Sequence, residues 1–258
     1  LAFYQRQILL PNIADFGLYH DDVVLSQGWL EPATTLAAAL LHLGLLAGAL
    51  FSARRFPAIA LGIGWFYMGH LLESTVFSLE LVHEHRNYLA MWGLLLATGA
   101  ILLRLSTEFL GLRRLGVVAI LAVFSGVTLA RADAMGSGIE YTLHEARLHP
   151  RSARAHYDAA TALFHGVQDG RFGLDQYGPV IAAHLDAALA ADPNALAPLL
   201  GKVSLAVREQ RRPTEELLEF ERRLRDGVPP AAIYMVAYSL MELVETGSPY
   251  FTPADLQQ

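Results

Sequence analysis

Long apolar runs separated by short polar turns dominate the first half of the chain. Four of these runs, at residues 33–51, 57–72, 88–103 and 115–130, contain no Asp, Glu, Lys or Arg. An α-helix rises about 1.5 Å per residue, so about 20 apolar residues cross the hydrocarbon core of a bilayer. The pattern therefore predicts about four transmembrane helices within residues 1–131.

Small residues indicate where two of these helices meet. Gly62, Gly64 and Gly69 interrupt the second apolar run. Lipid tails are as apolar as leucine, so helices in a bilayer associate through close packing rather than through the hydrophobic effect. We therefore expect all three glycines to lie where a neighbouring helix approaches closely.

The second half of the chain, residues 132–258, changes to amphipathic segments that are rich in Ala and separated by Gly and Pro. Pro150 and Pro193 lie where the closing prolines of successive tetratricopeptide (TPR) units are expected. An insertion between two helices, at residues 166–179, accounts for the extra distance between these prolines. The pattern favours a TPR-like α-solenoid over an unrelated helical bundle. The predicted fold is all-α: about four transmembrane helices followed by a TPR-like α-solenoid.

Composition agrees with a chain that lies only partly in a membrane. Charged residues make up 17%, below the roughly 25% of soluble proteins, and the mean hydropathy is +0.34. The net charge of −6 makes nucleic acid an unfavourable partner. The chain has no Cys, which excludes disulfides and thiolate metal sites. It begins at Leu1 without an initiator Met, and we expect it to be the C-terminal piece of a longer protein.

The arginines of the short turns predict an orientation. The turns at 53–57 and 104–114 contain five arginines, whereas the opposite ends of the predicted helices have only Arg6, Arg86 and Arg131. Loops rich in Lys and Arg stay in the cytosol. We therefore expect the two turns on the cytosolic side and the C-terminal half on the outer face.

The segment between the second and third apolar runs carries the densest group of ionisable side chains. It holds Glu73, Glu80, His83, Glu84, His85 and Arg86. Ionisable groups at membrane depth are energetically costly, so they indicate a functional site. If residues 79–88 are helical, Glu80, Glu84 and Asn87 share one face.

Three interpretations of this segment compete. The charges could form a salt-bridge cluster that tethers a re-entrant turn. His83 and His85 could bind a metal, although residues two apart on a helix point in different directions, which disfavours a shared ion. The third is a polar pocket for a phosphate-linked lipid or sugar, in which the planar fork of Arg86 binds phosphate and a carboxylate acts on a hydroxyl.

A polar loop at residues 11–32 adds further candidates. His20, Asp21 and Asp22 follow one another directly in this loop. They form either a solvated turn or part of the rim of an active site.

Two stretches, ESTVFSLELVHEHRNYLAM and FGLYHDDVVLSQG, together with the TPR-like helices, carry a resemblance to a known group. The chain resembles bacterial polytopic membrane proteins with C-terminal TPR repeats, which are related to GT-C glycosyltransferases and to transmembrane-and-TPR O-mannosyltransferases. The matching core is Glu84, His85, Arg86, Tyr88 and Leu89. The related pattern usually carries prolines near two positions that hold Ser78 and Ala90 here, which predicts a different turn.

The resemblance implies an enzyme of the bacterial inner membrane with its C-terminal domain in the periplasm. Such an enzyme transfers a sugar from a polyprenyl-phosphate donor to an acceptor on the outer face. Arg86 and His85 would contact the donor phosphate, and Glu84 and Glu80 would orient them. The rest of the expected substrate pocket is Glu73, His83, Tyr88, His20, Asp21 and Asp22.

The catalytic residue of the resembled enzymes lies in an early outer loop that this chain lacks. No catalytic base or metal ligand is therefore assigned, and a divalent cation as cofactor remains open. The expected partners are membrane lipid, a polyprenyl-phosphate-linked sugar, and a protein or peptide acceptor on the TPR-like domain. Two alternatives are a non-catalytic membrane-anchored TPR scaffold for envelope assembly and an O-antigen polymerase or ligase-like enzyme.

Overall fold

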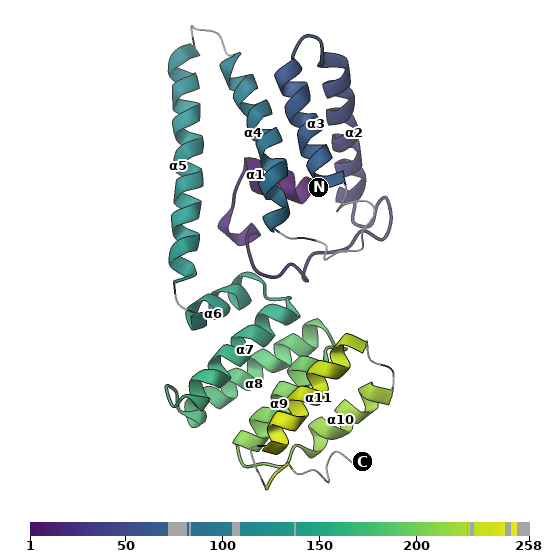
Figure 1. Ribbon diagram of the computed structural model, residues 1–258, viewed down its shortest axis with the longest axis vertical. Coiled ribbons are helices and arrows are strands. Elements are labelled where there is room, and N and C mark those ends of the chain that lie inside the picture. Colours follow the sequence, from purple (N-terminus) through teal and green to yellow (C-terminus); the bar gives the residue numbers. More distant parts are fainter. Residues whose placement is uncertain are drawn as a thin grey trace. The chain divides into compact units, whose positions relative to one another are not determined.

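The computed structural model describes residues 1–71, 82, 84–104, 109–136, 138–225, 227, 230–245 and 249–251. Within these residues the chain forms eleven α-helices and two short 3₁₀-helices, so the all-α prediction is confirmed. The chain divides into two compact units, Leu1–Asp133 (unit 1) and Ala134–Gln258 (unit 2). The helices of both units are labelled in Figure 1.

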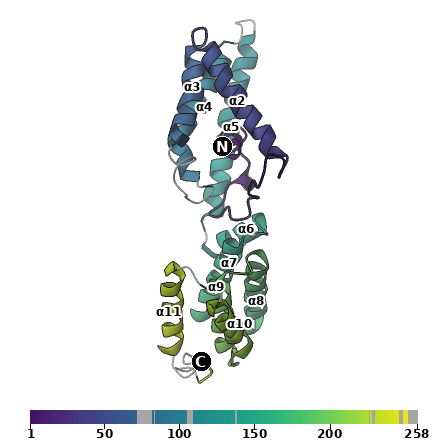
Figure 2. The same cartoon turned by 90° about the vertical axis from the view of Figure 1, so that its right-hand side faces the viewer.

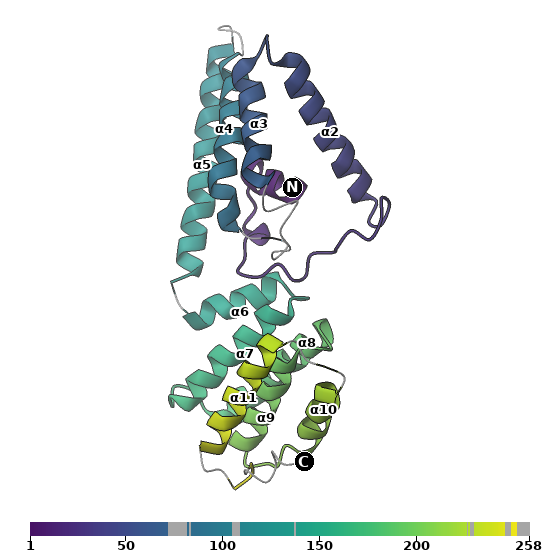
Figure 3. The ribbon, with the colours of Figure 1, turned by 45° about the vertical axis from the view of Figure 1, so that its right-hand side comes forward.

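Unit 1 consists of apolar helices joined by polar connections. Its elements are α1 (Ala2–Leu9), η1 (Ile13–Asp15), α2 (Thr34–Ser52), α3 (Pro57–Leu71), η2 (Glu84–Arg86), α4 (Asn87–Leu103) and α5 (Leu110–Ala134). α2 meets α3 near the turn that joins them, and the two helices diverge toward the first residues of α2 (Figure 3). The start of α4 and the end of α5 lie at the other end of unit 1 from this turn (Figure 1).

Three stretches of the described residues could cross a membrane. Thr34–Ser52, Glu84–Leu103 and Leu110–Ala134 are long and apolar enough by length and composition. They correspond to the first, third and fourth predicted spans. The second predicted span corresponds to α3, which is described as far as Leu71. Its 15 residues make it shorter than the other three. Its crossing of the membrane therefore stays a prediction.

The core of unit 1 depends on the close approach of α3 and α4. A Cβ atom placed on Gly62 would lie 2.5 Å from the carbonyl oxygen of Gly93, and one on Gly93 would lie 2.3 Å from the carbonyl oxygen of Gly62. A Cβ on Gly69 would lie 3.0 Å from that of Ala90. The predicted helix contacts at Gly62 and Gly69 are thus confirmed. The prediction for Gly64 is wrong, because that residue faces open space on the other side of α3.

Unit 2 is a stack of amphipathic helices. The described helices are α6 (Gly138–Leu148), α7 (Ala153–Gln168), α8 (Leu174–Ala191), α9 (Leu196–Arg208), α10 (Thr214–Arg225) and α11 (Pro230–Glu245). Each helix from α6 to α9 packs against the next, and α9 also contacts α7 and α11. These contacts do not establish a repeat architecture, so the TPR-like solenoid stays a prediction.

The insertion predicted at residues 166–179 is wrong, because most of these residues are helical. α7 continues to Gln168 and α8 begins at Leu174, so only 169–173 connects them. Pro179 lies inside α8, where it removes one backbone N–H from the helix. Gly and Pro predict a break in a helix, but the packing of α8 on α7 and α9 outweighs the local preference of one residue here.

The core of unit 2 follows from apolar side chains at helical spacing. Leu163 of α7 packs with Ile181 and Leu185 of α8, and each of these three side chains is at most 2% exposed. Ser152 begins α7, since its hydroxyl accepts a hydrogen bond from the Ala155 N–H at 3.0 Å. Several charged side chains of the same unit form ion pairs at the surface, such as Lys202 with Asp186.

Candidate functional site

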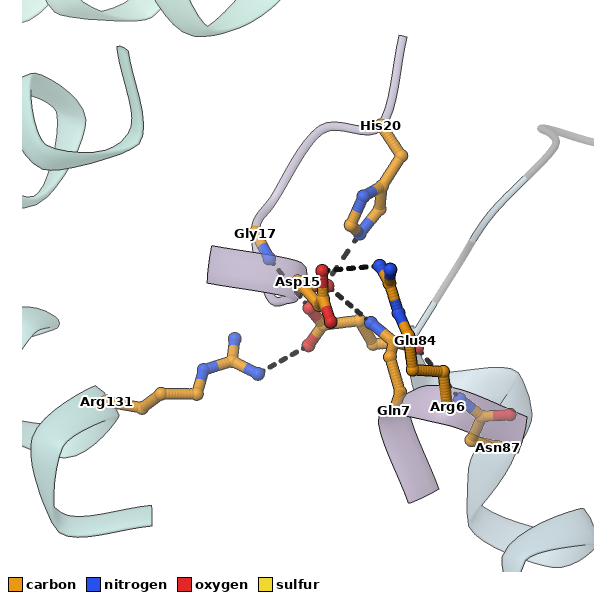
Figure 4. Close-up of polar contacts among 8 residues, drawn as sticks. All are labelled: Arg6, Gln7, Asp15, Gly17, His20, Glu84, Asn87 and Arg131. Carbon is orange, nitrogen blue, oxygen red and sulfur yellow. Dashed lines mark hydrogen bonds and ion pairs between the residues drawn. The ribbon is translucent and has the colours of Figure 1, made fainter. Parts of the chain in front are cut away.

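Glu84, in η2 just before α4, joins three segments that are far apart in the sequence. Its Oε1 accepts a hydrogen bond from the Gly17 N–H at 2.7 Å, and its Oε2 accepts one from Arg131 Nη1 at 2.6 Å (Figure 4). Nε2 of His20 lies 3.8 Å from Oε1. We call these four residues the Glu84 cluster.

The chain around the cluster explains why these groups meet. Asn12 begins η1 by accepting a hydrogen bond from the Ala14 N–H, and the turn that follows brings Gly17 to Glu84. Arg131 lies in the last turn of α5, where a cation interacts favourably with the helix dipole. Its guanidinium also lies 4.8 Å from the ring centroid of Phe16. The end of α5 is therefore fixed to the loop by two kinds of contact.

A second polar network lies beside the first and ties α1 to α4. Arg6 pairs with the Asp15 carboxylate at 2.5 Å, and the Gln7 amide donates to the Asp15 carbonyl oxygen (Figure 4). Asn87 in turn donates to Gln7 Oε1 at 3.2 Å. Gln7 and Asn87 are buried, and buried amides need such partners because an unmet hydrogen bond is costly.

An aromatic group packs next to these polar side chains. His70, near the end of α3, is 1% exposed and stacks on Tyr4 with ring centroids 4.9 Å apart. Phe66 meets the edge of His70 at 4.8 Å. Phe3 contacts the His20 ring at 5.5 Å. The first helix of the chain thus forms one side of the site, with rings facing both histidines.

The predicted site residues fall into three groups. Glu84 and His20 lie together, and the His20 side chain is only 4% exposed. His85, Tyr88 and Asp21 are exposed, whereas Arg86 and Asp22 are half-buried. Glu73, Glu80 and His83 lie outside the described residues.

Glu84 has two partners that sequence reasoning did not foresee. Its two oxygens bind Gly17 and Arg131, which come from a loop and from the end of α5. The resemblance implied that Glu84 orients Arg86 and His85, its neighbours in the chain, and that role stays a prediction. The arginine that pairs with Glu84 here lies more than 40 residues away.

Several residues of the site were missed by sequence reasoning. They are Arg6, Gln7, Asp15, Gly17, Asn87 and Arg131. Arg131 was used only to orient the helices, although a lone arginine at the end of an apolar helix was a usable signal. Gly17 makes its contact through the backbone N–H, so its residue type gives no sequence signal for the contact.

The site combines nitrogen donors with carboxylates that pair with them. Arg6, His20 and Arg131 supply cationic or hydrogen-bond-donating nitrogens, and Glu84 and Asp15 hold two of them in place. Within the described residues, no group of three or more His, Asp or Glu side chains could hold a metal ion.

Comparison with known proteins does not extend this description. No family model, curated protein or solved structure matches the chain. Any functional conclusion must therefore come from the contacts given above.

Proposed function

We propose that unit 1 binds the phosphate of a polyprenyl-phosphate-linked sugar at the Glu84 cluster, as the C-terminal part of a membrane glycosyltransferase. The observation that supports this most is the position of Arg131. Its guanidinium is held by Glu84 at one end of a candidate membrane-crossing helix, beside His20. A guanidinium fixed at the end of such a helix can bind the anionic headgroup of a lipid.

The distribution of charge along unit 1 agrees with this proposal. Arg131 and Glu84 lie at the same end of α4 and α5 (Figure 1). At the other end Arg104 donates to the Arg55 carbonyl oxygen, and both arginines lie over the Phe56 ring. The apolar helices separate these two polar ends, as expected for a protein with one face on each side of a bilayer.

The guanidinium of Arg131 has capacity for a ligand. Glu84 accepts from one of its nitrogens, Nη1. An arginine carries five N–H donors in a planar fork, so one carboxylate contact leaves donors for a phosphate. Arg131 is about three-quarters buried, and burial strengthens a charge-assisted hydrogen bond. Glu84 is then a positioning residue, because both of its oxygens are already engaged.

The scaffold alternative predicts no role for this arginine in lipid binding. A membrane-anchored scaffold needs the Arg131–Glu84 pair only to hold α5 in place. The proposed enzyme needs the same guanidinium to bind the donor. The two functions therefore differ in what a mutation of Arg131 does to affinity for the lipid phosphate.

The test is the binding of a short-chain polyprenyl phosphate by the full chain in detergent micelles, measured by tryptophan fluorescence. All three tryptophans, Trp29, Trp65 and Trp92, belong to unit 1. We expect Arg131→Gln to weaken binding by roughly ten-fold, because it removes a charge-assisted contact. Arg131→Lys should restore part of the affinity, since it returns the charge without the fork.

The matched control is Arg114→Gln, which makes the same chemical change near the other end of α5. It should leave binding unchanged. Equal affinity of the Arg131→Gln variant and the unmodified chain would refute the proposal. Equal affinity for the uncharged polyprenol would refute it as well.

A further inference from the structure

A groove in unit 2 shares no residue with the Glu84 cluster of unit 1 and is not explained by the function proposed for that unit. Its volume is about 550 Å³, within the range of sites for small ligands. Residues of α7, α8, α9 and α11 line it, and these four helices are labelled in Figure 2. A cavity of this size fits a short segment of chain and not a folded domain.

The floor of the groove is apolar. Ile181, Leu185 and Leu200 lie at its base and are each at most 4% exposed. Gly201 lets Leu185 pack closely against α9, because a Cβ at this position would lie 2.7 Å from Leu185 Cδ2. An apolar side chain of a ligand therefore has a surface on which to pack.

The rim is polar. His165 and Arg208 lie in the last turns of α7 and α9, and both line the groove. None of the described residues that line it is acidic. Gln168 and Gln210 lie close to these two residues in the sequence and also line the groove. Among the described residues, the rim thus offers a guanidinium, an imidazole and two amides but no carboxylate.

We infer that this groove binds an extended peptide segment in which an acidic side chain neighbours an apolar one. The apolar side chain packs on Leu185 and Leu200, and the carboxylate pairs with Arg208. An extended backbone leaves its N–H and C=O groups unpaired, and the side-chain amides of Gln168 and Gln210 both donate and accept. A purely apolar ligand would use only the floor of the groove and would make no contact with these amides or with Arg208.

The test uses the full chain in detergent and two fluorescein-labelled pools of hexapeptides, capped at both ends and followed by fluorescence anisotropy. One pool carries Leu-Asp at its two central positions, the other carries Leu-Lys, and all other positions are random. We expect the Leu-Asp pool to bind more tightly than the Leu-Lys pool by roughly ten-fold, since one charge-assisted contact distinguishes them.

Two arginine variants connect the binding to the groove. Arg208→Gln should weaken binding of the Leu-Asp pool by about ten-fold. Arg212→Gln removes the same charge from an exposed residue that does not line the groove, and it should have no effect. A third variant, Ser204→Phe, fills the groove and should abolish binding.

Three results would overturn the inference. They are equal binding of the Leu-Asp and Leu-Lys pools, unchanged binding by Arg208→Gln, and the absence of binding by the Leu-Asp pool. Arg208 and Arg212 are both exposed, so these two variants remain informative even if Ser204→Phe fails to fold. Because the groove and the Glu84 cluster are tested with different ligands, failure of one proposal leaves the other standing.

Discussion

The two units of the molecule place their large apolar side chains in opposite ways. In unit 1 these side chains are mostly exposed, and α5 has no buried residue at all. Polar side chains such as Gln7 and Asn87 are among the few buried groups of unit 1. In unit 2 the apolar side chains are buried, and among the described residues only six large ones are exposed.

This difference is what two different surroundings would produce, and the three candidate membrane-crossing stretches of unit 1 suggest that this unit associates with a membrane. Unit 2 follows the rule for proteins in water, where burial of apolar surface drives folding. Unit 1 is stabilised by backbone contact between α3 and α4 and by buried hydrogen bonds, which are the forces that hold helices together in lipid. One chain thus folds by two sets of interactions, and mutations can separate them.

The largest effect is expected in the core of unit 2. Leu185→Ala removes a side chain that is 2% exposed, and it should lower the free energy of unfolding of unit 2 by about 3 kcal/mol. Hydrogen exchange of peptides from α8 and α9, followed by mass spectrometry, measures this in the full chain. Peptides from α3 and α4 should exchange as before.

The control for this variant is Leu218→Ala, which truncates a leucine of α10 that is 62% exposed. It should change stability by less than about 0.5 kcal/mol. If Leu185→Ala also increased exchange in α3 and α4, the two units would not fold independently, and the comparison would fail.

A smaller effect is expected for the backbone contact in unit 1. Gly93→Ala places a methyl group 2.3 Å from the Gly62 carbonyl oxygen, and α3 and α4 must then separate. We expect a loss of about 2 kcal/mol, visible as a lower temperature of the fluorescence transition of Trp65 and Trp92.

The opposite sign is expected at Gly64, where a methyl group meets nothing within 4 Å. Gly64→Ala should be neutral or stabilise the helix by up to about 1 kcal/mol, because Ala is the better helix former. An equal loss of stability in Gly93→Ala and Gly64→Ala would mean that close helix contact is not the reason for glycine at position 93.

The smallest effect concerns pH and only unit 2. His184 lies 2.9 Å from His156, measured between the two Nδ1 atoms, and His156 Nε2 lies 3.2 Å from the Pro150 carbonyl oxygen. A carbonyl only accepts, so Nε2 of His156 carries a proton, and the Nδ1 of neutral His156 accepts from His184. Burial, together with the neighbouring His156, lowers the pKa of His184 from its ordinary value.

The sign of the pH dependence follows from this direction. His184 binds a proton more readily in the unfolded chain than in the folded one. Its contribution to the stability of unit 2 is therefore present above about pH 6.5 and is lost as the pH falls below that value. The group is half-exposed, so the loss between about pH 7 and pH 5 should not exceed about 0.5 kcal/mol. Exchange of α8 peptides at both pH values measures it. An equal pH dependence in the His184→Gln variant would show that this histidine is not the cause.

Much of the helical architecture could be predicted from apolar periodicity. The first span was expected at 33–51 and is found at Thr34–Ser52. An unbroken apolar run of this length favours a helix that is either buried or faces lipid. The start of the fourth was misplaced. α5 begins at Leu110 and includes Arg113 and Arg114, which were assigned to a turn. Arginine is a good helix former, and its charge does not end a helix.

The candidate site was harder to predict for a physical reason. Local spacing relates Glu84 to its neighbours in the chain, such as Arg86. Its described partners lie in a loop and at the end of α5, and only the tertiary fold brings them together. The expectation of a polar pocket drew on residue types and on a resemblance, and neither placed His20 within 3.8 Å of Glu84, because that separation is a property of the fold.

The hydrogen bond from Gly17 to Glu84 has a consequence for natural variation. The donor is a backbone N–H, which every residue except proline possesses. Glu84 and Arg131 interact through their side chains, so a change at one should select for a compensating change at the other. Position 17 carries no such coupling through this bond. Related chains could therefore retain the same contact while showing no shared residue at that position.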